Sequence, residues 1–120
     1  MSSNIDIVRK YWEFEAKKDL DGIMSCYHSD ATFKAPICEQ LQGAEALRSF
    51  YKGLLEGDTK AHVEITRSTD EGERVAVEFI LHFDMGGGKK GEMYGCNVFT
   101  VRDGKFQNVR SYFDPSDFDV

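Results

Sequence analysis

The chain has 120 residues and a mass of 13.6 kDa, which is the size of one domain. Its composition, 41% hydrophobic and 30% charged, is typical of a globular protein and excludes a disordered or fibrous chain. The net charge is −6 and no stripe of Lys and Arg is present, which argues against nucleic acid as a partner.

The cysteines and the hydropathy pattern favour the cytoplasm. Cys26, Cys38 and Cys96 are odd in number and widely spaced, which fits reduced thiols better than a disulfide framework. The first six residues lack the basic region and apolar run of a signal peptide. No apolar stretch approaches the roughly 20 residues that cross a bilayer. We therefore expect a cytoplasmic protein without a membrane partner.

The first half of the chain predicts three helices. Ile5, Val8 and Trp12 recur at helical spacing in the first helix, which ends at the polar run 15–18. Asp19 caps a short second helix. The apolar side of that helix is formed by Leu20, Ile23, Met24 and Tyr27. The third helix covers about residues 44–55.

The remaining segments predict strands. A brief strand at 32–35 is stopped by Pro36 and followed by a loop to Gly43. From residue 62 the apolar residues alternate, as in strands exposed on one face. The strands cover residues 62–69, 75–84, 92–102 and 105–114, with a hairpin connection at 86–88. Helices followed by antiparallel strands indicate one α+β domain over residues 1–120, with helices packed on a curved sheet.

Several segments carry a family resemblance. They are Arg9–Tyr11, Asp19–Ile23, Asp30–Thr32, Gly43–Leu47, Asn97–Phe99, Asp103–Lys105 and Arg110–Asp114. Their order and spacing resemble the SnoaL-like and ketosteroid isomerase-like members of the nuclear transport factor 2-like superfamily. The resemblance implies a cone-shaped curved antiparallel sheet, packed by three helices around an aromatic cavity. It also implies a homodimer through the outer sheet face, on which we expect Ile80, Val98 and Phe106.

The resemblance to the isomerases assigns an oxygen-binding pair. In those enzymes a Tyr and a protonated Asp hydrogen-bond the substrate oxygen. The Tyr matches Tyr11, and supporting tyrosines match Tyr27 and Tyr51. The Asp matches Asn97, whose amide donates a hydrogen bond at any pH. Tyr11 and Asn97 are therefore candidate catalytic donors to a ligand oxygen.

The essential base of the isomerases is absent, because its position is occupied by Ala35. A general base contributes about 10²–10⁴-fold to a rate, so we do not expect ordinary steroid isomerase activity. The triad of the limonene-type epoxide hydrolases falls near Phe79, near Leu81 and on Ser111, which also argues against that activity. A substitute base is expected from Glu39, from Asp114 or from the substrate itself.

The length of the last hairpin loop decides which side chains face Asn97. A three-residue loop with Gly104 as its bulge places Asn97 opposite Val109, with Ser111 and Phe113 facing the pocket. A two-residue loop places Asn97 opposite Arg110 and turns Tyr112 and Asp114 inward. We favour the three-residue loop. The expected ligand-binding residues are then Tyr27, Phe33, Ala35, Tyr51, Phe79, Leu81, Phe83, Phe99, Val109, Ser111 and Phe113.

These observations favour an apolar small molecule with one ketone or phenol oxygen as the ligand. The reaction expected is that of a cofactor-free isomerase, dehydratase or cyclase. The alternative is a non-catalytic ligand-binding or dimeric scaffold module of the same fold. No metal is expected, because the Cys and His spacings do not match a zinc site. His28, His62 and His82 are expected to be structural.

Overall fold

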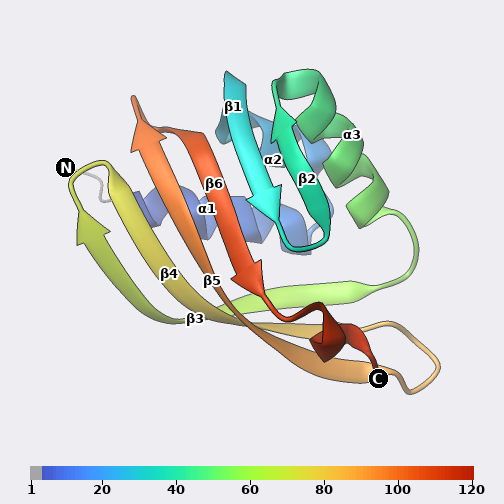
Figure 1. The fold of residues 1–120 in the computed structure, drawn as a ribbon. Coiled ribbons are helices and arrows are strands. Elements are labelled where there is room, and N and C mark those ends of the chain that lie inside the picture. Colours follow the sequence, from blue (N-terminus) through green and yellow to red (C-terminus); the bar gives the residue numbers. More distant parts are fainter. Residues whose placement is uncertain (1–3) are drawn as a thin grey trace.

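Three helices pack against one curved sheet in the computed structural model of the protein, which describes residues 4–120 (Figure 1). They are α1 (Asn4–Ala16), α2 (Leu20–Ser25) and α3 (Ala44–Leu55). Each lies where the apolar spacing predicts a helix, and the α+β class is confirmed. Residues 1–3 of the expected domain lie outside the described residues. Among residues 4–120, no helix is both long and apolar enough to cross a membrane.

The sheet has six strands in the order β2-β1-β6-β5-β4-β3. They are β1 (Tyr27–Ala35), β2 (Cys38–Gln42), β3 (Lys60–Glu71), β4 (Arg74–Asp84), β5 (Lys90–Arg102) and β6 (Lys105–Phe113). The expectation of a fully antiparallel sheet is wrong in one place, because β1 and β6 run parallel. A parallel pair needs a long crossover connection, which the chain from β2 to β5 provides. A short 3₁₀ helix, η1 (Pro115–Phe118), follows β6.

The segment before α3 is more regular than predicted. Tyr27 begins β1 rather than closing α2, and the expected loop after Pro36 contains β2. The chain reverses at Pro36, so that Leu41 pairs with Phe33 and Cys38 with Ala35. β2 is short and lies at the sheet edge, so its propensity is a weak signal and its pairing with β1 makes it a strand.

The hairpin between β5 and β6 combines both predicted alternatives. Its loop is the two-residue turn Asp103–Gly104, with φ of 50° and 75°, so the predicted three-residue loop is wrong. Positive φ at both positions fits a tight hairpin turn. Gln107 is then an extra residue in β6, since Val101 pairs with Phe106 but Thr100 with Asn108. The bulge places Asn97 opposite Ser111, neither Val109 nor Arg110.

The bulge also decides which residues of β6 are buried. Val109 and Ser111 are buried, whereas Arg110 and Tyr112 are exposed, as the favoured alternative predicts. Phe106, expected on the outer face, is fully buried, and that expectation is wrong. Because the extra residue follows it, Phe106 points inward, with its ring centroid 4.7 Å from that of Phe99.

Candidate functional site

A cavity of about 110 Å³ lies between α1, α3 and the inner face of the sheet. Nine expected site residues line it: Tyr11, Phe33, Ala35, Tyr51, Phe79, Leu81, Asn97, Ser111 and Phe113. Eight further residues complete the lining: Trp12, Glu15, Ile37, Phe50, Leu54, Val63, Met93 and Phe118. Ile37 and Leu54 are 52% and 49% exposed, so the cavity opens to solvent beside them.

The volume limits the ligand. An apolar cavity of about 150 Å³ is known to admit benzene. The present cavity is smaller, and pockets for drug-sized ligands usually measure roughly 300–1,000 Å³. A cavity of this size favours a ligand close to a single small ring over a four-ring steroid.

Three buried tyrosines form a hydrogen-bonded row behind the cavity. Tyr51 Oη lies 2.6 Å from Tyr11 Oη and 2.6 Å from Tyr27 Oη. Tyr51 has one proton for two contacts, so it donates to one neighbour and accepts from the other. Burial, followed by the nearby Tyr51 and Glu15, raises the pKa of Tyr11 well above its ordinary value, so Tyr11 stays a neutral O–H donor.

Asn97 brings an unpaired polar group to the same cavity. Its side chain is 4% exposed, and Oδ1 has no hydrogen-bond partner within residues 4–120. A buried polar atom without a partner destabilises the fold by about 1–3 kcal/mol, so such atoms usually have one. A ligand in the cavity can supply that partner.

Glu15 is the unexpected member of the site. It lies in the last turn of α1, and protein atoms surround its carboxyl group although the residue keeps some exposed surface. Burial raises its pKa from 4.5 to about 7, while the nearby Tyr11 hydroxyl acts in the opposite direction. The cavity therefore contains a carboxyl group that is about half ionised near neutral pH.

A residue at this position can be found from helical spacing alone. Glu15 follows Tyr11 by four residues and Trp12 by three, so all three share one face of α1. A Glu on the face that carries two buried aromatic residues indicates a carboxyl directed into the protein. The polar run 15–18 obscures this signal, because such runs also end helices.

Four of the expected wall residues lie outside the cavity lining. Tyr27 hydrogen-bonds Tyr51 and belongs to the layer behind it. Phe99 and Val109 are fully buried in the core. Phe83 packs on Phe118, with ring centroids 5.0 Å apart.

The two expected substitutes for the base also lie outside the cavity. Glu39 is exposed on the edge strand β2. Asp114 is exposed and caps η1, accepting hydrogen bonds from Ser116 N at 3.0 Å and Ser116 Oγ at 2.8 Å. These bonds hold the pKa of Asp114 below its ordinary value, which makes it a weaker base.

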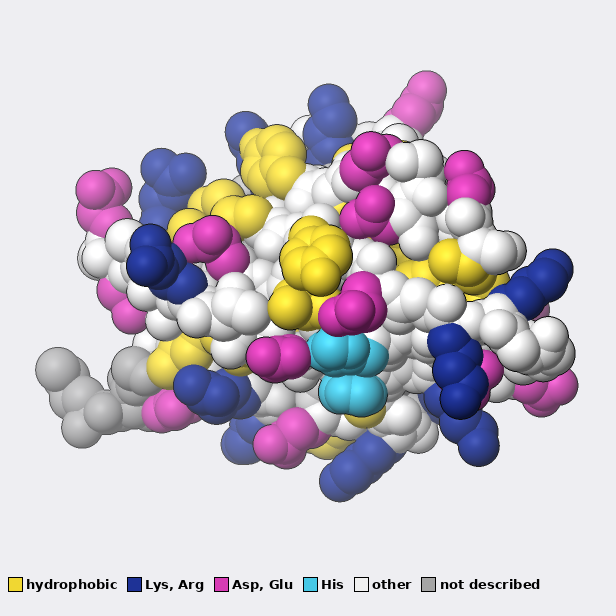
Figure 2. Space-filling view, turned by 90° about the horizontal axis from the view of Figure 1, so that it is seen from below, with side chains coloured by type: hydrophobic (Ala, Val, Ile, Leu, Met, Phe, Trp, Pro, Cys, Tyr) yellow, Lys and Arg dark blue, Asp and Glu magenta, His cyan; other side chains and the backbone are white. Residues whose placement is uncertain are grey.

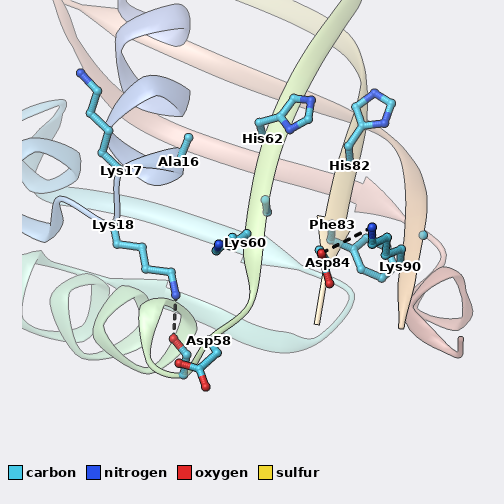
Figure 3. A pocket seen from close by; sticks show the side chains of 13 residues that line it. Ala16, Lys17, Lys18, Asp58, Lys60, His62, His82, Phe83, Asp84 and Lys90 are labelled. Carbon is cyan, nitrogen blue, oxygen red and sulfur yellow. Dashed lines mark hydrogen bonds and ion pairs between the residues drawn. The ribbon is translucent and has the colours of Figure 1, made fainter. Parts of the chain in front are cut away.

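A larger hollow of about 1,050 Å³ lies elsewhere, beside β3, β4 and the end of α1 (Figure 3). It is open to solvent and lined by charged as well as apolar residues. Lys18 donates to Gly57 O at 2.7 Å, and Lys90 lies 3.9 Å from Asp84. These solvated, partly paired groups form no enclosed site. Within residues 4–120, no three His, Cys, Asp or Glu side chains lie close enough together to hold a metal ion.

The histidines are engaged in the structure. His28 Nε2 lies 2.6 Å from Arg102 O. His62 and His82 stack with ring centroids 4.9 Å apart, and two touching histidines beside acidic side chains are visible in Figure 2. His82 also lies 2.9 Å from Glu64 and 3.5 Å from Glu92. None of the three lines the cavity.

The sequence matches the model of the SnoaL-like domain over residues 8–109. This match covers most of the chain, and the protein belongs to the SnoaL-like family. The superfamily resemblance predicted from the sequence is thereby confirmed. No curated protein is similar enough to the sequence to serve as a relative.

Several solved structures share the fold. A protein from Catenulispora acidiphila with a ketosteroid isomerase-like fold, in complex with trimethylamine, is 16% identical with a TM-score of 0.83, covering 93% of this chain and 88% of that one. An epoxide hydrolase of the LEH-like kind from M. tuberculosis is 22% identical with a TM-score of 0.80, covering 96% and 85%. A putative polyketide cyclase from Xanthomonas campestris is 24% identical with a TM-score of 0.78, covering 92% and 90%. These identities support the fold alone.

Proposed function

We propose that the protein binds a small apolar molecule through one oxygen atom and catalyses a cofactor-free proton transfer on it, as an isomerase, dehydratase or cyclase does. The observation that carries this proposal is the unpaired Oδ1 of Asn97, buried in the same apolar cavity as the Tyr11 hydroxyl. The two ends of a carboxamide have nearly the same shape, so Asn97 can donate to a ligand carbonyl or accept from a ligand hydroxyl.

The pair suits a developing oxyanion. When a proton leaves the carbon next to a ketone, negative charge moves to the ketone oxygen. Donors fixed in a water-poor site stabilise that charge, and one such donor contributes about 10²–10³-fold. Tyr11 and Asn97 are the proposed donors.

One solved neighbour supports a ligand of this size. The Catenulispora protein holds trimethylamine, a molecule small enough for a cavity of about 110 Å³. The Xanthomonas neighbour is a putative polyketide cyclase. The size of the cavity favours a single-ring ketone or phenol over a polycyclic substrate.

Ligand binding without chemistry is the competing function. Ala35 favours this function, because it lines the cavity at the position of the isomerase base and cannot carry a proton. Turnover of a small β,γ-unsaturated ketone distinguishes the two functions. Binding of phenol without turnover of such a ketone favours a carrier or scaffold.

We also propose that the protein is a homodimer in the cytoplasm. A cytoplasmic homodimer would pair the outer faces of two sheets. On that face Ile80 and Val98 are only partly buried, and Tyr94 and Tyr112 are 60% and 54% exposed. Sedimentation of the purified protein tests this assembly, and a monomer at micromolar concentration would contradict it.

Tyr11→Phe tests the oxygen-binding role. We expect phenol to bind the variant about two- to tenfold more weakly, because one net hydrogen bond contributes about 0.5–1.5 kcal/mol. Isothermal titration calorimetry measures the difference. The control is Tyr94→Phe, which alters an exposed tyrosine outside the cavity. Equal affinity of Tyr11→Phe and the wild type would contradict the role.

A further inference from the structure

We propose that Glu15 is the proton acceptor of the cavity, an assignment that rests on the proposed function. Glu15 occupies a different element from Ala35, so the missing base is replaced from α1 rather than from β1. Glu15 is not among the catalytic residues expected from the sequence.

The position of the carboxyl group is the first argument. Glu15 lines the cavity together with Tyr11 and Asn97, one helical turn after Tyr11. Tyrosines apart, it is the only ionisable side chain among the described residues that line this cavity. The cavity has a volume close to that of one small ring, so a ligand held by Tyr11 and Asn97 lies within reach of Glu15.

The surroundings make the carboxylate a competent base at neutral pH. α1 presents the Tyr11 hydroxyl to it, α3 presents Tyr51, and β1 places Tyr27 behind them. The lining residues from β3, β4, β5, β6 and η1 are apolar or neutral. No cation among the lining residues stabilises the charge, and burial raises the pKa of Glu15 to about 7. A general base is most effective when its pKa lies near the working pH.

The step balances without any co-reactant. The Glu15 carboxylate removes a proton from the carbon next to the substrate ketone. The electrons of the broken C–H bond form a C=C bond, and the carbonyl π electrons move to the oxygen held by Tyr11 and Asn97. In an isomerisation, Glu15 then returns the proton to the γ carbon and the carbonyl re-forms.

The experiment uses cyclopent-3-enone, a β,γ-unsaturated ketone about the size of benzene, with the full chain in heavy water. Proton NMR reports exchange of the α protons and migration of the double bond. We expect Glu15→Gln to lower kcat by about 10²–10⁴-fold. We expect phenol to bind that variant as it binds the wild type. Glu15→Asp, which keeps a carboxylate, should retain part of the activity.

The control is Glu13→Gln, because Glu13 is exposed on the same helix and does not line the cavity. It should leave kcat unchanged. For the wild type, kcat/KM should rise with pH through about 7, the pKa of Glu15. The residual activity of Glu15→Gln should lack this rise. A purely structural role of Glu15 would not move the pH profile in this way.

The remaining outcomes separate the two proposals. Wild-type turnover that Glu15→Gln preserves would overturn the assignment of Glu15 and leave the proposed function intact. Phenol binding without wild-type exchange or turnover would overturn Glu15 as proton acceptor and leave a ligand-binding protein. Neither binding nor turnover by the wild type would overturn the proposed function itself.

Discussion

Glu15→Gln should be more stable than the wild type at pH 8 and equally stable at pH 4. The unfolded chain releases the Glu15 proton near its ordinary pKa of 4.5, whereas the folded protein releases it near 7. Between these values the folded state holds a proton that the unfolded state has lost. The contribution of Glu15 to stability is therefore full below about pH 4.5 and is lost as the pH rises through about 7.

The size of this effect follows from the shift. One pKa unit corresponds to about 1.36 kcal/mol, and the new amide N–H groups of Gln offset part of the gain. We therefore expect the free energy of unfolding of Glu15→Gln to exceed that of the wild type by roughly 2–3 kcal/mol at pH 8. Urea unfolding followed by the fluorescence of Trp12, the single tryptophan, measures the free energy of unfolding. Glu13→Gln should show no such pH dependence. An equal difference at both pH values would contradict the buried carboxyl.

Higher stability of Glu15→Gln at pH 8 would also support the interpretation of its lower kcat. A variant that is more stable than the wild type at pH 8 does not lose activity through unfolding. Functional sites often contain groups that lower the stability of the fold but are needed for activity, and a buried carboxylate that destabilises the fold fits this pattern.

Tyr51→Phe should destabilise the protein by roughly 2–3 kcal/mol, more than any other hydroxyl removal in the tyrosine row. Tyr51 is 1% exposed and makes both 2.6 Å contacts of the row. Its removal leaves the buried hydroxyls of Tyr11 and Tyr27 without this partner. Tyr27→Phe should destabilise the protein by only about 1 kcal/mol, because the contact between Tyr51 and Tyr11 remains.

The same series reports on the cavity. Hydrogen bonds in a chain strengthen one another, so Tyr51→Phe should also weaken phenol binding at Tyr11. Chemical denaturation and calorimetry on the same samples measure both effects. Tyr94→Phe, an exposed tyrosine, should change stability by less than about 0.5 kcal/mol. A Tyr51→Phe variant no less stable than Tyr27→Phe would contradict the row as described.

The helices and the long strands were predictable because their patterns are local. Residues 44–55 repeat apolar side chains at helical spacing, and residues 75–84 alternate them. β2 was not predictable, because its state depends on pairing with β1 rather than on its own residues. The Gln107 bulge was missed for a related reason. It shifts the alternation by one residue between Phe106 and Val109, and the pairing with β5 rather than the local pattern fixes where that shift occurs.

The site was predictable in part. The tyrosine row and Asn97 follow from the family resemblance, and all but Tyr27 line the cavity. Their roles as ligand contacts stay predictions. Glu15 was missed because it begins the polar run 15–18, which also ends the helix, although it shares one face of α1 with Tyr11 and Trp12. Ile37 and Leu54 were missed because they reach the cavity mouth only in the folded chain.

A crystal structure of the protein with phenol tests the oxygen-binding cavity most directly. We expect one phenol ring among Trp12, Phe33 and Phe79, with its oxygen within hydrogen-bond distance of Tyr11 Oη and of the Asn97 side chain. Phenol bound only in the open hollow beside His62 and Lys90, or a cavity closed by its own side chains, would contradict it.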